Sequence, residues 1–151
     1  MAYIFFGCSM RGGRPFVSRN ELADIANAIE ALGHSLATQH QTKPGIIAEE
    51  DRHTKVFIHD REYGRMKTAD CGIFEVSNPS LGVGSEISDM IAMKKPVLCL
   101  YRYDLYDVVS AYILGKAESN YIKTPYECYG YESLEGIRQK VEDFVQKISN
   151  R

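Results

Sequence analysis

The stretch CGIFEVSNPSLGVGSEISDMIAMKKPVLCLY, which runs from Cys71 to Tyr101, predicts a β-α-β unit. Its first part, Cys71 to Val76, is an apolar run typical of a buried strand. Ser85 to Met93 predicts a helix, and Pro96 to Tyr101 predicts a second buried strand. This order favours two parallel strands connected by a helix that crosses over the sheet.

The rest of the chain continues the alternation. Further strands are predicted at Tyr3 to Gly7, Ser35 to Thr38 and Tyr121 to Lys123, and further helices after the capping box Ser18-Arg19-Asn20-Glu21, at His59 to Thr68, Tyr106 to Leu114 and Ser133 to Ser149. Gln41 to Lys55 is polar and without a clear period, which favours a mobile loop or lid. The whole pattern predicts an α/β fold: a parallel sheet covered by helices on both faces, with ligands beyond the carboxyl ends of the strands.

Length and composition narrow the class of protein. A chain of 151 residues fits a single domain spanning 1–151, and its net charge of −2 excludes the broad basic surface of a protein that binds nucleic acid polymers. No apolar stretch approaches the ~20 residues that span a membrane, and the first residues lack a basic leader region. We therefore expect a cytoplasmic protein, with the nucleus as an alternative.

The cysteines and histidines give no sign of a metal site. Cys8, Cys71, Cys99 and Cys128 lie far apart without a C-x-x-C pair, which favours reduced, mostly buried thiols over zinc ligands or disulfides. The four histidines also lack the i, i+4 spacing of a helical metal site. We expect neither a metal nor a cofactor.

Two loops could hold an anionic ligand. Gly7-Cys8-Ser9-Met10-Arg11-Gly12-Gly13-Arg14 follows the first strand, but it is neither G-x-G-x-x-G nor G-K-[ST], so dinucleotide and ATP binding do not follow, and a plain glycine-rich turn remains open. Ser77 to Glu86 leads from a buried strand into a helix, whose N-terminal amides and dipole favour anions. From position alone, Glu86 could equally be an acid that complements the helix dipole.

These stretches resemble a known family. Phe5 to Arg14, Ala69-Asp70, Glu75-Val76 and Pro79 to Glu86 are similar to the nucleoside 2-deoxyribosyltransferase superfamily, and within it to the 2′-deoxynucleoside 5′-phosphate N-hydrolases (the Rcl type) and related CMP N-glycosidases. The similarity extends through Lys95 to Arg102 and Ser110 to Ile113. It implies a Rossmann-like (flavodoxin-like) fold and an N-glycosidase that releases free base and (deoxy)ribose 5-phosphate from (2′-deoxy)nucleoside 5′-monophosphates. The alternatives are a 2-deoxyribosyltransferase and a non-catalytic nucleotide-binding module.

The resemblance also implies catalytic roles. Glu86 stands at the position of the family nucleophile, which forms a covalent glycosyl-enzyme by attack on the anomeric carbon. We expect nearby helix amides to keep the pKa of Glu86 low. The family places an Asp as general acid where this chain has Glu62, and Asp60 is an alternative if the helix register differs.

Substrate contacts follow in the same way. Ser80 and Ser110 replace an Asp and an Asn of the transferases, which favours a phosphate over an unphosphorylated 5′ end, because a carboxylate would repel it. In the relatives the residue at Ser110 reaches into the neighbouring subunit, which implies a homodimer. Phe5 replaces a Tyr, which could relax the choice between ribose and deoxyribose, and the preferred base stays open. The implied substrate-binding residues are Phe5, Gly7, Cys8, Ser9, Met10, Arg11, Gly12, His40, Ser80, Gly82, Ser110 and Tyr112.

Overall fold

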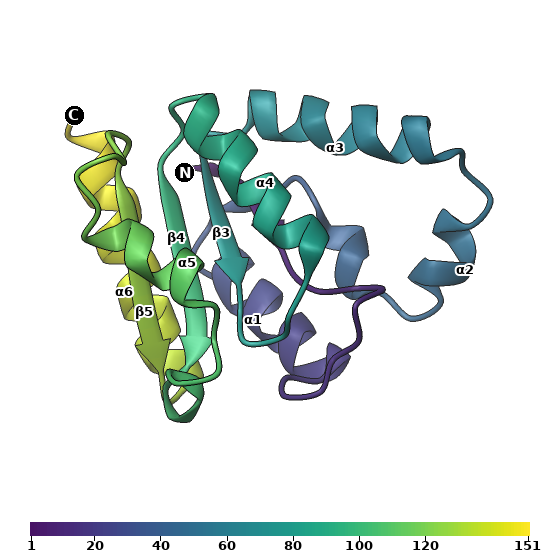
Figure 1. The fold of residues 1–151 in the computed structure, drawn as a ribbon, viewed down its shortest axis with the longest axis horizontal. Coiled ribbons are helices and arrows are strands. Elements are labelled where there is room, and N and C mark those ends of the chain that lie inside the picture. Colours follow the sequence, from purple (N-terminus) through teal and green to yellow (C-terminus); the bar gives the residue numbers. More distant parts are fainter.

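The computed structural model describes residues 1–151, apart from the side chain of His40. Its described part contains one parallel sheet in the order β2-β1-β3-β4-β5, which confirms the predicted α/β fold. This strand order is that of flavodoxin-like folds. The strands are β1 (Tyr3–Gly7), β2 (Ser35–Leu36), β3 (Cys71–Glu75), β4 (Val97–Arg102) and β5 (Tyr126–Tyr131). The helices are α1 (Arg19–Glu30), α2 (Ile46–Glu50), α3 (Lys55–Thr68), α4 (Leu81–Ala92), α5 (Ala111–Leu114) and α6 (Leu134–Ser149), with short 3₁₀ turns η1 (Gln39–Thr42), η2 (Tyr103–Leu105) and η3 (Gly115–Ala117) (Figure 1).

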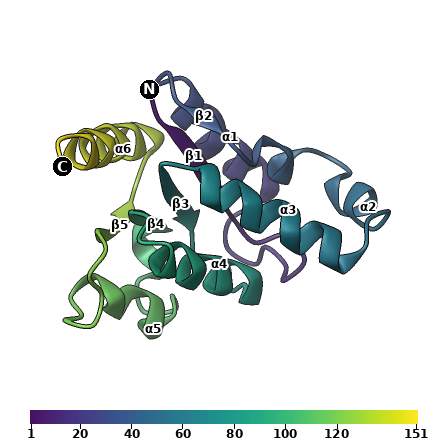
Figure 2. The same ribbon diagram turned by 90° about the horizontal axis from the view of Figure 1, so that it is seen from above.

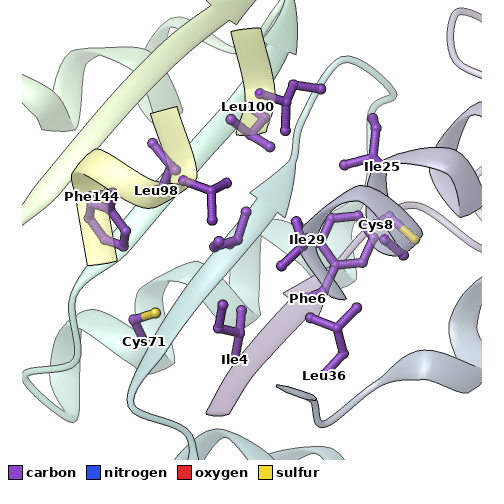
Figure 3. Close-up of a cluster of buried hydrophobic side chains, with 14 of the residues drawn as sticks. Ile4, Phe6, Cys8, Ile25, Ile29, Leu36, Cys71, Leu98, Leu100 and Phe144 are labelled. Carbon is purple, nitrogen blue, oxygen red and sulfur yellow. The ribbon is translucent and has the colours of Figure 1, made fainter. Parts of the chain in front are cut away.

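Helices cover both faces of the sheet. Figure 2 shows α1 and α6 on one face and α3, α4 and α5 on the other. Because successive side chains of a strand point to opposite faces, Ile4 and Phe6 pack under α1 and α6, whereas Phe5 packs on the other side with Phe74 and Ile87. Figure 3 shows the first of these two cores. The apolar runs of the strands are therefore buried on both sides, as parallel sheets require.

The structure confirms the predicted capping box and changes the bounds of two other segments. Ser18 caps α1, and Glu21 closes the capping box from the opposite direction. The helix predicted from Ser85 begins four residues earlier, at Leu81, because the Ser80 side chain accepts a hydrogen bond from the amide of Val83. The segment from Gln41 to Lys55, expected to be a loop, contains α2 and part of η1.

Two predictions near the C-terminus were wrong. Tyr121 to Lys123 forms no strand; the edge strand is β5, at Tyr126–Tyr131. Only Ala111–Leu114 of the expected helix from Tyr106 is α-helical. The edge strand β5 pairs with β4 alone, so its position is decided by this pairing and needs little apolar periodicity of its own.

The connections define where a ligand crevice forms. From β1 the chain crosses by α1 to β2, whereas from β3 it crosses by α4 to β4 on the opposite side. The neighbours β1 and β3 pair from Ile4↔Cys71 to Gly7↔Phe74. The loops that leave them diverge, because they lead to α1 and α4 on opposite faces of the sheet. Such a switch point opens a crevice at the carboxyl ends of the strands. None of the helices that the structure describes is long and apolar enough to cross a membrane.

Candidate active site

A cavity of about 450 Å³ opens at this switch point. Its size suits a small organic ligand. In Figures 1 and 2 the loop after β1 passes beside the start of α4, and these two segments form much of the wall. The lining residues are Cys8, Met10, Arg11, Gly12, Gln41, Glu50, Ile58, Ser80, Leu81, Gly82, Val83 and Glu86.

Glu86 lies in the second turn of α4, over the end of β1. A Cβ atom on Gly7 would stand 3.2 Å from Glu86 Oε2 and 2.4 Å from the ring of Phe74, so a side chain at this position would collide with the aromatic ring. The absence of a side chain at Gly7 lets the Glu86 carboxylate approach the backbone of β1. The Glu86 carboxyl group therefore lies beside the carboxyl end of β1.

The electrostatics of Glu86 differ from the expectation. Burial raises the pKa of Glu86 to about 8, and the nearby carboxylates of Glu62 and Asp89 raise it further. The expected lowering of the Glu86 pKa by helix amides is wrong. The free N–H groups of α4 belong to its first turn, and Glu86 lies beyond that turn. In the protein without substrate, the protonated form therefore dominates at neutral pH.

The structure distinguishes the two candidate acids on α3. Glu62 is buried, and its Oε1 accepts hydrogen bonds from Arg61 Nε at 2.8 Å and Arg65 Nη1 at 2.7 Å. Asp60 instead has a largely exposed side chain, which contacts His59 Nδ1 at 2.9 Å. The charge of the Glu62 carboxylate contributes to the raised pKa of Glu86.

Asn78 joins the two loops that form the cavity. Its Oδ1 accepts from the amides of Phe16 and Val17 at 3.0 and 3.1 Å, and its Nδ2 donates to the carbonyl of Val17 at 2.8 Å. Nearby, a Cβ on Gly12 would lie 2.9 Å from the carbonyl oxygen of Pro79, so only glycine permits this close approach. The loop after β1 is thus fixed against the loop that begins α4.

Polar groups at the mouth of the cavity could meet an anion. Ser80 and Gly82 lie at the N-terminus of α4, where free amides and the helix dipole favour negative charge. Arg11 lines the same mouth and forms an exposed ion pair with Asp51 at 2.7 Å. Because exposed pairs contribute only about 0–1 kcal/mol, a phosphate could readily draw Arg11 away from Asp51. Ser9, by contrast, is buried and donates its hydroxyl to Gly13 O at 2.8 Å.

Comparison with known proteins identifies the family. A 5-hydroxymethyl-dUMP N-hydrolase of Danio rerio is 36% identical over 145 residues, covering 95% of this chain and 98% of the relative. A Methanosarcina mazei protein named as a candidate 2′-deoxynucleoside 5′-phosphate N-hydrolase is 32% identical, covering 96% of this chain and 84% of that protein. The chain belongs to the 2′-deoxynucleoside 5′-phosphate N-hydrolases. It is therefore an enzyme.

Further comparisons agree on the fold. The 5-hydroxymethyl-dUMP N-hydrolase of Rattus norvegicus is 34% identical, covering 78% of this chain and 71% of that protein. The structure of a Clostridium botulinum CMP N-glycosidase superposes with a TM-score of 0.61, covering 93% of this chain and 98% of that chain. At 16% identity this likeness concerns the fold alone. A scan against protein-family models finds no match.

In this N-hydrolase, the cavity also contains residues that the sequence analysis did not single out. Gln41, Glu50 and Ile58 line it from the segment between β2 and the first turn of α3. Glu50 accepts hydrogen bonds from Arg61 Nη1 and Nη2 at 2.9 and 2.7 Å. Glu50 and Arg61 are eleven residues apart in the sequence, and no periodic pattern predicts that they pair. Only the folded structure reveals this ion pair.

Other predicted site residues of the N-hydrolase lie away from this cavity. Phe5 has no exposed surface and packs against Phe74, with ring centroids 5.8 Å apart. Ser110 lines a separate cavity of about 180 Å³ together with Ser80, on the other side of the start of α4. Tyr112 is exposed, with Lys116 Nζ 4.3 Å from its ring centre. The side chain of His40 lies outside the described part of the structure.

The described residues form no metal cage. Among them, no group of three or more histidine, cysteine, aspartate or glutamate side chains is arranged to hold a metal ion. Two carboxylates near the site, those of Glu50 and Glu62, instead form ion pairs with Arg61, and Glu62 also pairs with Arg65.

Proposed function

We propose that this enzyme hydrolyses the N-glycosidic bond of (2′-deoxy)nucleoside 5′-monophosphates, releasing free base and (deoxy)ribose 5-phosphate. One observation carries the proposal: Glu86 lines a cavity at the switch point of the sheet together with an anion-favouring helix N-terminus, and the buried Glu62 carboxylate contributes to its raised pKa. The names of the relatives, which are N-hydrolases of nucleoside phosphates, support it.

The proposed reaction has two steps. A Glu86 oxygen attacks C1′ and forms an ester bond, while the bond from C1′ to the base nitrogen breaks and leaves its electron pair on the base. A water molecule then attacks C1′, which breaks the ester bond and releases the sugar phosphate and the Glu86 carboxylate. Each step inverts the configuration at C1′, so the two steps together retain it, and neither needs a metal or a cofactor.

A second carboxyl group supplies the proton. Glu62 protonates the departing base in the first step and takes a proton from the attacking water in the second. Because burial raises the pKa of Glu86 to about 8, Glu86 has to lose its proton before it attacks C1′. Asp60 is the less suitable acid because it points to solvent.

The 5′-phosphate occupies the mouth of the cavity in this proposal. Arg11, Ser80 and the first amides of α4 bind its oxygens, with Gly82 allowing close approach. An Asp at Ser80, about 4 Å from a phosphate, would cost about 4 kcal/mol per charge at an effective dielectric near 20, before screening.

A substrate panel tests this function. We expect free base from nucleoside 5′-monophosphates and little from the matching nucleosides, because only the former engage the anion site. Ser80→Asp should shift the preference towards nucleosides, measured as the ratio of kcat/KM for the two substrates. Equal cleavage of both substrates by the wild type, or formation of a new nucleoside when a second base is added, would contradict the proposal.

We further propose that the single catalytic domain, 1–151, works as a homodimer whose sites share Ser110. Within its own chain Ser110 lines a cavity apart from that of Glu86. Around it the surface is apolar: Leu81 is 97% exposed, Tyr112 77% and Val108 57%. Exposed apolar side chains on neighbouring elements suit a contact with a second copy, which would bring its Ser110 to the phosphate.

A further inference from the structure

Glu75 is a buried carboxyl group that the reaction described above does not use. It is the last residue of β3, is 1% exposed, and lies where the chain leaves the sheet for the loop that begins α4. Burial raises the pKa of Glu75 to about 7, and hydrogen bonds from Ser77 and Tyr131 limit the rise. A carboxyl group at this depth needs donors on its oxygens, because burial without them costs stability.

Three donors point at the Glu75 carboxyl group. The amide of Ser77 donates to Oε2 at 3.2 Å, the Ser77 hydroxyl donates to Oε1, and the Tyr131 hydroxyl of β5 donates to Oε1 at 3.1 Å. An ionised carboxylate can accept from all three, because it is an acceptor only. A protonated carboxyl group has a hydrogen of its own that needs an acceptor, so one of the two hydroxyls would have to turn. The three contacts therefore fit the ionised form of Glu75.

Ser77 connects Glu75 to the wall of the cavity. Its hydroxyl also accepts a hydrogen bond from the amide of Arg102 at 2.8 Å, so one oxygen joins the start of the loop to the ends of β3 and β4. Asn78, the next residue, holds the loop after β1. Ser80 follows, caps α4 and lines the cavity. The Glu75 carboxylate is thus the buried anchor of the loop to which the phosphate is assigned.

We propose that Glu75 is a positioning residue, which acts through Ser77 to hold the loop that begins α4 in the shape that binds the 5′-phosphate. This inference rests on the proposed function, because it concerns the phosphate end of the same site. Glu86 does not depend on this anchor, since Ile87 and Met90 pack α4 on the sheet and have no exposed surface. Loss of the anchor should therefore weaken substrate binding and leave the chemical step nearly intact.

The anchor should depend on pH. The charged and titratable groups around Glu75 are Arg102 at the end of β4, Tyr131 on β5, Cys8 in the loop after β1 and, beyond Tyr131, Glu21 of α1. Arg102 and Glu21 stay charged near neutral pH. Burial raises the pKa of Cys8 to about 12 and raises the pKa of Tyr131 as well, so neither ionises there. Of these groups only Glu75 titrates near pH 7, and the anchor should be lost as pH falls through that value.

The variant Glu75→Gln tests the proposal, because it removes the charge and adds two amide hydrogens among the three donors. We measure kcat and KM at pH 6 and pH 8.5 for the nucleoside 5′-monophosphate that the wild type cleaves fastest in the panel above. At pH 8.5 KM should rise about tenfold with kcat within about threefold of the wild type, the pattern of lost substrate binding. At pH 6 the wild-type carboxyl group is itself mostly protonated, so the two KM values should differ by less than about threefold.

Two further variants are matched to this test. Ser77→Ala removes the hydroxyl through which Glu75 acts, should raise KM in the same way at pH 8.5, and serves if Glu75→Gln does not fold. Glu132→Gln removes an exposed carboxylate next to Tyr131 and should keep the wild-type KM at both pH values. The titrations of Glu86 and of the substrate phosphate are common to all these proteins, so they cancel in each ratio of KM values.

The outcomes separate this inference from the function on which it rests. Glu86-dependent base release with an unchanged KM in Glu75→Gln and Ser77→Ala at pH 8.5 would overturn the inference and leave the proposed function standing. A loss of kcat as large as the rise in KM, or a rise in KM of the same size at both pH values, would also overturn it, because Glu75 would then serve the fold alone. If the wild type releases no base from any nucleotide, the proposed function and the inference fail together.

Discussion

At the residue scale, the reactivity of Glu86 follows from where the fold places its carboxyl group. Burial raises the pKa of Glu86 to about 8, well above the 4.5 that is usual for Glu. The folded protein therefore holds a proton that the unfolded chain releases between about pH 4.5 and pH 8. Stability linked to this group is fully present below pH 4.5 and is lost as pH rises through 8.

This linkage predicts how Glu86→Gln changes stability. The neutral amide resembles the protonated acid, so at pH 5 the variant and the wild type should unfold at nearly the same temperature. At pH 9 the wild type carries a half-buried anion at Glu86, and the variant should unfold at a higher temperature by a few degrees. Thermal unfolding across this range measures the difference. As a control, Glu142→Gln removes an exposed carboxylate and should follow the wild type. A difference that does not grow with pH would show that the fold does not raise the pKa of Glu86.

At the element scale, the sequence predicted the two strands of the β3-α4-β4 unit well. The apolar runs of β3 and β4 and the periodic residues of α1 and α6 each carry their own local signal, because buried parallel strands and amphipathic helices need many apolar residues. The start of α4 was missed by four residues because Gly82 and Gly84 lower helix propensity, while the cap at Ser80 overrides them.

The candidate site was predictable only in part. The two loops were found by their position after strands, and the cavity indeed brings Met10, Arg11, Gly12, Ser80 and Glu86 together. Gln41 and Glu50 were missed because they come from a segment without periodicity and owe their burial to tertiary contacts. The pKa of Glu86 was misjudged for a related reason: the helix dipole is visible in sequence, whereas desolvation depends on what the fold packs around the group.

At the scale of the whole molecule, the proposed sharing of Ser110 between subunits makes a prediction about mixed dimers. Ser110→Ala should weaken nucleotide binding by about 1–3 kcal/mol, and Glu86→Gln should inactivate the chain that carries it. In a hybrid of the two variants, the site with the native Glu86 receives the native Ser110 from its partner. Random exchange would then restore about one quarter of the sites, measured as base release above that of either parent.

The hybrid experiment needs proof that subunits exchange, which differently tagged chains provide. If exchange is complete and the mixture is no more active than its parents, Ser110 serves the site of its own chain or none. The catalytic assignment of Glu86 does not depend on that outcome, because the cavity that contains Glu86 lies within one chain.

The central claim is that Glu86 cleaves the bond between base and sugar. Its most direct test is the rate at which free base appears from a nucleoside 5′-monophosphate, measured for the wild type, for Glu86→Gln and for the surface control Glu142→Gln. We predict wild-type rates for the control and a folded Glu86→Gln variant below about one hundredth of the wild-type rate, because an amide is a poor nucleophile and cannot offset the positive charge that develops at C1′. A folded Glu86→Gln variant that keeps more than about one tenth of the wild-type rate would contradict the claim.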